Sequence, residues 1–210
     1  MSTLIFLRHA HSQANESNLL AGRTPGVLLS KKGQRQALQL VERIGKAKLD
    51  QVHISPMARC QLTIDPWLES RYSSAIEALD IREEFTEMDY GDWSGKKLAS
   101  LRRSPLWKPI QETPSKVKFP GGESFRQAQK RAVDGCEDLL SSRGNKFHLV
   151  VSHSDLIKLI AVHYLESHID AFQRIDISQA SFTVIQRNRG SLNIISINSA
   201  SDLRSIVGTR

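Results

Sequence analysis

Two short apolar runs stand out along the chain, and each one leads into a histidine. Leu4–Leu7 is followed by Arg8 and His9, and Phe147–Ser152 is followed by His153. Apolar runs of this length between polar residues are typical of buried strands. In an open α/β sheet, chemistry collects just past the carboxyl ends of such strands. Because parallel strands end at the same edge of a sheet, we expect His9 and His153 to lie close together.

The rest of the chain alternates between helical and extended periods. Ser30 is a good N-cap for a helix that ends near Gly45, and Pro56 suits the first turn of a helix from about Met57 to Tyr72. Similar patterns predict strands at 52–55, 78–81, 181–187 and 192–198, and helices at about 124–142 and 156–167. The tail after Ala200 is polar, and we expect it to fray.

This order of elements predicts an α/β fold, a three-layer sandwich with a mixed, mostly parallel central sheet and helices on both faces. A chain of 210 residues suits a single domain spanning residues 1–210. From Arg82 to Pro120 no period persists, and prolines break any long element. Because structureless stretches of this length are often lids, we predict a lid-like insertion at about residues 95–120.

The net charge of +7 is concentrated in this insertion. It carries seven cationic side chains against one acidic one, a local net charge of +6. If it folds over the site, it favours substrates with a second anionic group and speeds their capture. Trp93, Trp107 and Phe119 punctuate this stretch, and aromatic residues among lysines can bind single-stranded nucleic acid. Nothing else resembles a nucleic-acid module, so we expect these aromatics to pack the lid.

The composition indicates the cellular compartment in which we expect the protein. No apolar run approaches the length of a membrane span, and the amino terminus has no signal-peptide pattern, so we expect a cytoplasmic protein without a membrane partner. Cys60 and Cys136 are far apart and fit free, buried thiols in a reducing compartment. A homodimer is compatible with the chain, although no feature of the sequence specifies one.

The residue types at the predicted sheet edge suit a phosphoryl group. Arg59 begins a helix directly after a short strand and can reach the edge that holds Arg8, His9 and His153. Guanidinium groups bind phosphate oxygens in pairs and stay charged at any working pH. His11 alternates onto the same face as His9, but no cysteine or carboxylate completes a ligand set, and we predict no metal site.

Five segments then carry motifs in order along nearly the whole chain. They are Leu7-Arg8-His9-Ala10-His11-Ser12 with Asn15, Ser55 to Thr63 around Arg59, Glu87-Met-Asp-Tyr-Gly91-Asp-Trp-Ser-Gly95, Pro120-Gly-Gly-Glu-Ser124, and Val151-Ser-His153-Ser-Asp-Leu-Ile-Lys158. In this order they resemble the histidine phosphatase superfamily, in its phosphoglycerate mutase-like branch. One Arg-His pair alone is a weak signal, whereas five ordered motifs are specific.

The resemblance implies roles for five catalytic residues. His9 attacks phosphorus and becomes a phosphohistidine, while Arg8, Arg59 and His153 hold the phosphoryl oxygens. Glu87 protonates the departing alkoxide and then activates the water that hydrolyses the intermediate. These roles suit the residue types, because a neutral imidazole is available near pH 7 and an alkoxide needs an acid in order to leave. No step requires a metal or another cofactor.

The resemblance also implies substrate-binding positions. Asn15 matches the motif asparagine, and Ser154 belongs to the second histidine motif. In the sugar-phosphate mutases of the family, Ala21-Gly22 and Tyr90 have counterparts that contact substrate. The pair Arg102-Arg103 is similar to their paired arginines but comes sooner after Glu87, and Leu98 falls where their lysine is expected.

These departures favour a phosphatase acting on a small anionic phosphorylated metabolite. One alternative is a phosphoglycerate mutase-like phosphomutase primed by 2,3-bisphosphoglycerate. The other is a catalytically inactive binding protein.

Overall fold

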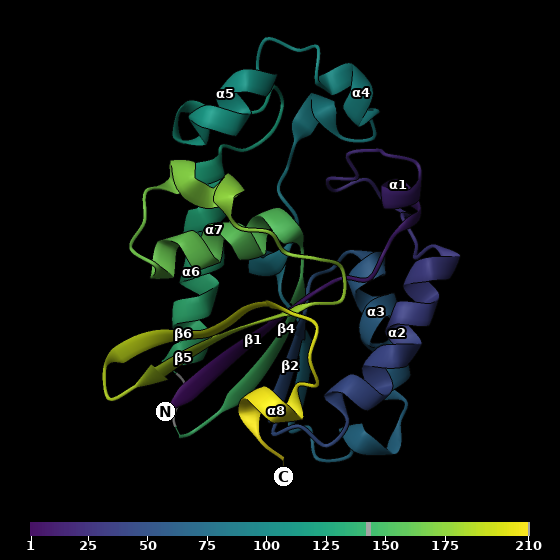
Figure 1. Ribbon diagram of the computed structural model, residues 1–210, viewed down its shortest axis with the longest axis vertical. Coiled ribbons are helices and arrows are strands. Elements are labelled where there is room, and N and C mark those ends of the chain that lie inside the picture. Colours follow the sequence, from purple (N-terminus) through teal and green to yellow (C-terminus); the bar gives the residue numbers. More distant parts are fainter. Residues whose placement is uncertain (142–143, 210) are drawn as a thin grey trace.

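A six-stranded mixed sheet forms the centre of the computed structural model, which describes residues 1–141 and 144–209 (Figure 1). The strand order is β3-β2-β4-β1-β5-β6. The strands are β1 (Ser2–Arg8), β2 (Gln51–Ile54), β3 (Ala78–Ile81), β4 (Phe147–Ser152), β5 (Phe182–Asn188) and β6 (Ser191–Ser199). The first four are parallel, and β5 and β6 form an antiparallel hairpin beside β1. The predicted fold class is therefore confirmed.

Alternation of side chains along β1 divides the core into two layers. Leu4 and Phe6 pack with residues of α6 (Phe125–Leu140) and α7 (Ser154–Tyr164). Ile5 and Leu7 point the other way and pack with α2 (Lys31–Ile44) and α3 (Ala58–Leu68). Figure 1 shows these two helix pairs on opposite faces of the sheet. Because β1 is apolar on both faces, it is fully buried between them.

Side-chain caps mark the starts of the two longest helices, α2 and α6. The Ser30 hydroxyl accepts a hydrogen bond from the Gly33 N–H (3.2 Å) and caps α2, as predicted. Ser124 caps α6 through the Gln127 N–H (3.2 Å), and the Gln127 side chain returns a bond to the Ser124 backbone. The predicted end of this helix at Ser142 lies outside the described residues, and α6 ends at Leu140.

Two helix boundaries were predicted wrongly. α3 ends at Leu68, and a separate 3-10 turn, η1 (Arg71–Ser73), follows because the Ser70 side chain accepts from the Tyr72 N–H and starts a new cap. α7 runs over Ser154–Tyr164 rather than 156–167. Its N-cap is His153 itself, which has an extended backbone, so the strand passes into the helix with no linking loop.

Residues 95–120 lie beyond the carboxyl ends of the parallel strands (Figure 1). Their elements are α4 (Leu98–Leu101), α5 (Trp107–Glu112) and η4 (Pro114–Lys116). As predicted, no long element forms there. Leu101, Ile110, Val117 and Phe119 from this segment are buried in the core layer that also contains α6 and α7. The segment is therefore anchored by apolar packing, and its closure over the site stays a prediction.

The prediction that the carboxyl-terminal tail frays is wrong. Leu203 is fully buried in the α2/α3 core layer, and its N–H donates to the Arg43 carbonyl (2.8 Å). The short helix α8 (Arg204–Val207) follows, and the Lys48 N–H bonds the Gly208 carbonyl (3.1 Å). Ile206 and Val207 are partly buried against the same layer, so Leu203 is the most deeply buried of three apolar side chains that dock the tail. No helix among the described residues is long and apolar enough to cross a membrane.

Replacing Leu203 with Ala removes this anchor and leaves a cavity in the core. We expect the free energy of unfolding to fall by about 2–4 kcal/mol. For a domain of this size the loss corresponds to a decrease in Tm of roughly 5–15 °C, measured by calorimetry. Ser201→Ala, at an exposed position of the same tail, serves as the control and should leave Tm unchanged. An unchanged Tm for Leu203→Ala would contradict the docked tail.

Candidate active site

The ends of β1 and β4 bring the two predicted histidines together. Arg8 pairs with Ser152 in the parallel register, and the His9 N–H donates to the Ser152 carbonyl (2.9 Å). The ring centres of His9 and His153 are 5.2 Å apart. Both side chains are almost completely buried. Their proximity, predicted from the two strand ends, is confirmed.

One hydrogen bond selects the tautomer of His9. Its Nδ1 lies 2.7 Å from the Ala10 carbonyl oxygen, which can only accept, so Nδ1 carries the proton. In a neutral ring this leaves the lone pair on Nε2. Burial lowers the pKa of His9 well below its usual value, and the charges of Arg59 and Arg8 lower it further. At neutral pH His9 is therefore a neutral imidazole whose Nε2 lone pair is free for the predicted nucleophile role.

His153 is held by partners on both ring nitrogens. Nε2 lies 2.7 Å from the Ser55 hydroxyl, and Nδ1 accepts from Arg59 Nη2 at 3.2 Å. Burial lowers the pKa of His153 well below its usual value, and Arg59 and His9 add to the shift. Its proton therefore sits on Nε2 in the ligand-free protein. Cys60 Sγ lies 3.5 Å from the same nitrogen, and burial raises the pKa of this thiol to about 12, so it is not a nucleophile.

Two guanidinium groups near the histidines have N–H donors without a hydrogen-bond partner among the described residues. Arg59 is only 1% exposed, and its Nη2 donates to the Gly22 carbonyl (2.9 Å). Arg8 donates through Nη1 to the Ile177 carbonyl. The buried atoms Arg8 Nε, Arg59 Nε and Arg59 Nη1 have no hydrogen-bond partner among the described residues. Unpaired buried donors on two cations match a ligand with several anionic oxygens.

Glu87 contributes a carboxyl group to the same cavity. Its Oε1 accepts from the Met88 N–H (2.9 Å), and its Oε2 lies 3.7 Å from His153 Nδ1. Burial raises the pKa of Glu87 to about 7, and the negative charge of Asp155 is the second cause. A carboxyl group that titrates near neutrality can both give and take a proton at working pH.

A partly exposed ion network behind Glu87 fixes its backbone. The Glu87 carbonyl accepts from Arg23 Nε (2.9 Å) and Arg131 Nη2 (3.2 Å). Both arginines bond the Glu123 carboxylate, which also accepts from the Asp89 N–H (2.8 Å). The sequence did not predict these roles. Arg131 lies 44 residues from Glu87, and only the fold places α6 against this loop.

Four of the five predicted catalytic side chains, all except His153, line a cavity of about 190 Å³ at the carboxyl end of β1. Its lining includes Arg8, His9, Arg59 and Glu87, together with the predicted positions Asn15, Ala21, Gly22, Tyr90 and Ser154. Gly22 has a φ of +51°, and a Cβ there would lie 2.5 Å from the Ser94 hydroxyl oxygen. Only glycine therefore lets this loop approach Tyr90 and Ser94. The substrate-binding roles of these residues stay predictions.

Arg102 and Arg103 lie outside this cavity, contrary to their predicted position. Both are exposed, and neither lines the cavity. The Arg102 guanidinium carbon instead lies 5.9 Å from the centre of the Trp107 ring. The reason is that the insertion turns its apolar residues inward. Leu98, predicted to stand at the mutases' lysine position, lines the cavity instead, beside Asp155, whose role the sequence did not predict.

Other features of the described residues do not compete with this site. His11 bonds Ser30 through Nδ1 (2.8 Å), and no group of three or more His, Cys, Asp or Glu among the described residues is arranged to hold a metal. Cys60 and Cys136 are free and buried, as predicted.

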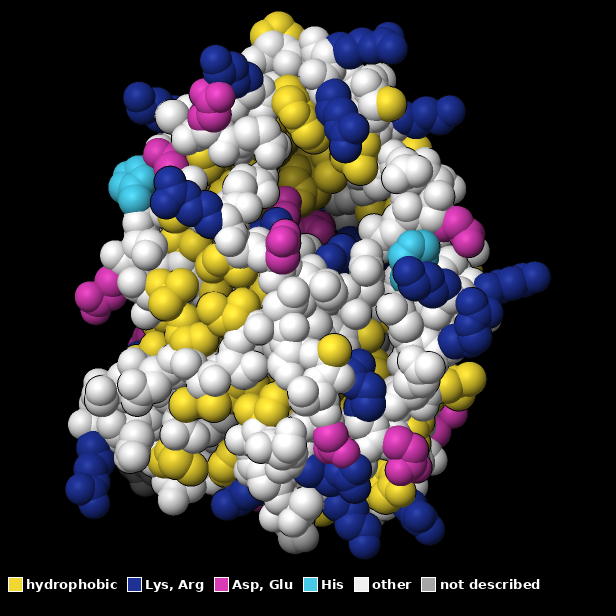
Figure 2. Space-filling model, viewed as in Figure 1, with side chains coloured by type: hydrophobic (Ala, Val, Ile, Leu, Met, Phe, Trp, Pro, Cys, Tyr) yellow, Lys and Arg dark blue, Asp and Glu magenta, His cyan; other side chains and the backbone are white. Residues whose placement is uncertain are grey.

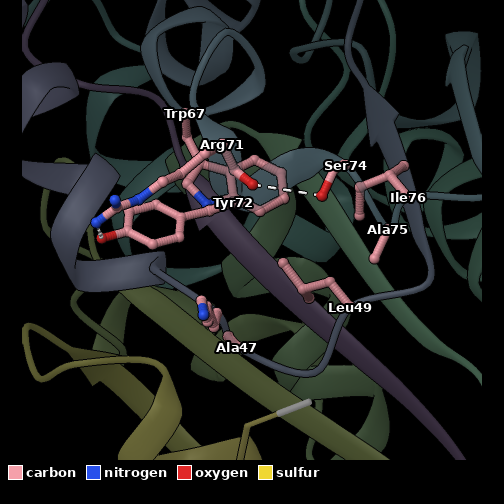
Figure 3. Close-up of a pocket in the computed structure, with 9 residues that line it drawn as sticks. Ala47, Leu49, Trp67, Arg71, Tyr72, Ser74, Ala75 and Ile76 are labelled. Atoms are coloured by element: carbon pink, nitrogen blue, oxygen red, sulfur yellow. Dashed lines mark hydrogen bonds between the residues drawn. The ribbon is translucent and has the colours of Figure 1, made fainter.

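A separate cavity lies before the start of β2, at the opposite end of the sheet (Figure 3). Leu49, Trp67 and Tyr72 border it, and Ser74 donates its hydroxyl to the Arg71 carbonyl there (3.3 Å). None of its described lining residues is a histidine or a carboxylate, so it lacks an acid–base pair.

Comparison with known proteins agrees with the site. The family model for the histidine phosphatase superfamily (branch 1) matches residues 4–200. The chain belongs to the histidine phosphatase superfamily. The resemblance predicted from five motifs is thus confirmed.

Two curated relatives in this superfamily have different activities. The chain is 29% identical over 203 residues to phosphoserine phosphatase 1 of Hydrogenobacter thermophilus, with 94% of this chain and 92% of that protein covered. It is also 29% identical to the 2,3-bisphosphoglycerate-dependent phosphoglycerate mutase of Parvibaculum lavamentivorans, with 76% and 78% covered. Among solved structures, YhfR from Bacillus stearothermophilus aligns with a TM-score of 0.87 at 21% identity, covering 97% of this chain and all of that one, and shares the fold.

The position of Asp155 in this member of the histidine phosphatase superfamily predicts how Glu87 titrates. The Tyr90 hydroxyl donates to Asp155 Oδ2 (2.8 Å), and an asparagine can still accept this bond. Because Asp155 raises the pKa of Glu87, Asp155→Asn should lower the midpoint from about 7 by about one pH unit. The measurement is a ¹³C NMR titration of labelled glutamate carboxyls, with Glu87→Gln used for assignment.

Tyr90→Phe is the matched control, because it removes the hydrogen bond and keeps the charge of Asp155. It should not lower the Glu87 midpoint. An identical midpoint in wild type and Asp155→Asn would show that Asp155 does not tune this carboxyl.

Proposed function

We propose that the protein is a phosphomonoester hydrolase that works through a phosphohistidine on His9. The observation that carries this proposal is the lone pair on His9 Nε2 beside two buried guanidinium groups with unpaired donors. Such a site neutralises a phosphoryl dianion and holds a nucleophile against it. Phosphatase relatives such as phosphoserine phosphatase 1 support the same reaction class.

In the first step the His9 Nε2 lone pair attacks phosphorus and the bond from phosphorus to the ester oxygen breaks. Arg8 and Arg59 donate to the phosphoryl oxygens through their unpaired N–H groups. Glu87, with a pKa of about 7, gives its proton to the departing alkoxide. The arginines stabilise charge that spreads over the phosphoryl oxygens in the transition state.

In the second step a water molecule attacks the phosphohistidine. Glu87, now a carboxylate, accepts a proton from the water as its oxygen bonds phosphorus, and the bond from phosphorus to Nε2 breaks. Phosphate leaves, and Glu87 is protonated again for the next cycle. Each proton and bond is accounted for by His9, Glu87 and water, so the proposed reaction uses no metal or cofactor.

A phosphomutase is the second candidate because a bisphosphoglycerate-dependent mutase is among the relatives. A mutase holds a second anionic group while the intermediate reorients. In this structure the seven cations of residues 95–120 are exposed, and Leu98 borders the catalytic cavity. This arrangement favours the phosphatase. An inactive binding protein is disfavoured because all five catalytic residues converge.

Beyond the reaction class, several expectations stay predictions. We propose that the substrate is a small phosphorylated metabolite. We also propose that the protein has no nucleic-acid or membrane partner. We further propose a cytoplasmic location, and a homodimer as an assembly compatible with the chain.

The acid role of Glu87 predicts a dependence on the leaving group. Glu87→Gln should lower kcat/KM for an alkyl phosphate by about 10²–10⁴-fold, because the alkoxide then leaves without a proton. The loss should be far smaller for 4-nitrophenyl phosphate, since 4-nitrophenolate leaves unaided. Steady-state phosphate release measures both values. Equal losses for the two esters would remove Glu87 from the acid role.

The nucleophile role of His9 predicts a covalent intermediate. Rapid quenching with a ³²P-labelled ester should trap an acid-labile, base-stable label on wild type and none on His9→Ala. The same preparation is then assayed with 3-phosphoglycerate, with and without 2,3-bisphosphoglycerate. Phosphoryl transfer between positions faster than phosphate release would overturn the phosphatase proposal in favour of the mutase.

A further inference from the structure

A second cavity adjoins the catalytic cavity beneath residues 95–120, and we call it the side cavity. Four residues line both cavities, namely Leu20, Tyr90, Leu98 and Asp155. The two spaces therefore meet at a shared wall directly beside the catalytic groups. A group bonded to a phosphoryl held by Arg8 and Arg59 has the side cavity next to it.

The far wall of the side cavity is aromatic and aliphatic. It is formed by Trp93, Trp107, Ile110, Phe119 and Phe125. Phe119 packs edge-on against Tyr90 and Trp93, with ring centres 5.1 and 5.5 Å away. Because most of these rings are buried and in mutual contact, the wall is preformed rather than assembled around a ligand.

The size of the side cavity suits one six-membered ring. Its volume is about 140 Å³. Apolar cavities of about 150 Å³ in proteins bind benzene. Two amide side chains, Gln111 and Gln173, also border the space. An apolar pocket with few polar groups favours an apolar ligand and uses the polar groups to orient it.

Charge at the junction argues against a second anion. All seven lysines and arginines of residues 95–120 are exposed, and none lines either cavity. Figure 2 shows a hollow near the top of the molecule, with hydrophobic side chains in its wall and Lys and Arg side chains projecting outward around it. The charged side chain shared by the two cavities is the carboxylate Asp155. Its Oδ1 lies 3.9 Å from Lys158 Nζ, which lines neither cavity, so the carboxylate that faces both spaces disfavours a second carboxylate next to the ester oxygen.

We propose that the side cavity receives the alcohol part of the substrate, and that this alcohol carries an aryl or compact branched apolar group without a neighbouring carboxylate. The proposal rests on the phosphatase function proposed above and names its substrate class. It replaces the second anion site predicted from the charge of the insertion.

Three esters test the proposal by steady-state kinetics. Benzyl phosphate fills the side cavity, ethyl phosphate leaves it empty, and phosphoglycolate adds a carboxylate next to the ester. We expect kcat/KM for benzyl phosphate to exceed that for ethyl phosphate by about tenfold or more, because a phenyl ring leaves water. Phosphoglycolate should be the poorest of the three. Equal values for benzyl and ethyl phosphate, or a preference for phosphoglycolate, would overturn the proposal.

Substitutions at two residues that line the side cavity test whether this cavity causes the preference for benzyl phosphate. Trp107→Ala and Leu98→Ser should each reduce the preference for benzyl over ethyl phosphate several-fold, mainly by lowering the value for benzyl phosphate. Leu98 is half-buried on a short helix, so its substitution keeps the test open if Trp107→Ala does not fold. Lys108→Ala on α5 is the control, since this exposed side chain lines neither cavity, and it should keep the full preference. A full preference in both folded wall variants would contradict the assignment.

Binding of uncleavable phosphonates separates this proposal from the reaction itself. By calorimetry, 2-phenylethylphosphonate should bind wild type about tenfold more tightly than propylphosphonate, and 3-phosphonopropionate should bind most weakly. If no ester is hydrolysed and no phosphohistidine forms, the phosphatase proposal fails, while this order still supports an apolar side cavity. Equal binding of the first two phosphonates overturns the side-cavity proposal, whether or not esters are hydrolysed.

Discussion

Positive charge held out of water is the constraint on which the site depends. Arg59 is almost fully buried, and neither it nor Arg8 forms an ion pair with a carboxylate among the described residues. Burying a cation without a partner costs several kcal/mol. Packing elsewhere in the fold offsets this free-energy cost. A bound phosphoryl group lowers the cost, because its anionic oxygens pair with the two cations. Burial lowers the pKa of His9, and the charges of Arg59 and Arg8 lower it further and keep its lone pair available.

A second, opposite field acts on Glu87. Burial and Asp155 raise its pKa, while Arg59 and Arg8 lower it, and the balance lies at about 7. The acid therefore works between two sets of charges that oppose one another. The backbone at Glu87 is held separately, because Arg23 and Arg131 donate to its carbonyl and both bond Glu123. Separate groups thus position the carboxyl and set its proton affinity.

The insertion at residues 95–120 shows how one segment can present two chemistries. Its cations are exposed, where they affect long-range attraction of anions, and its Trp107 and Ile110 border the side cavity. Net charge along the sequence describes the outer surface of this segment and gives no account of its inner one. In the proposed assignment, the substrate is selected at the inner surface, which is lined by apolar groups and the carboxylate of Asp155.

The sequence by itself determined the sheet, most helices and the residues proposed to be catalytic. Apolar runs and N-caps are local, and Arg8, His9 and His153 follow strand ends whose meeting point is dictated by parallel pairing. Only the tertiary structure decided the docking of Leu203, the support of Glu87 by Arg131 and the outward turn of Arg102. Each of these depends on a partner distant in sequence or on which face of a short, irregular element is buried. The local hydrophobic pattern specifies neither the distant partner nor the buried face, because both depend on how the whole chain packs.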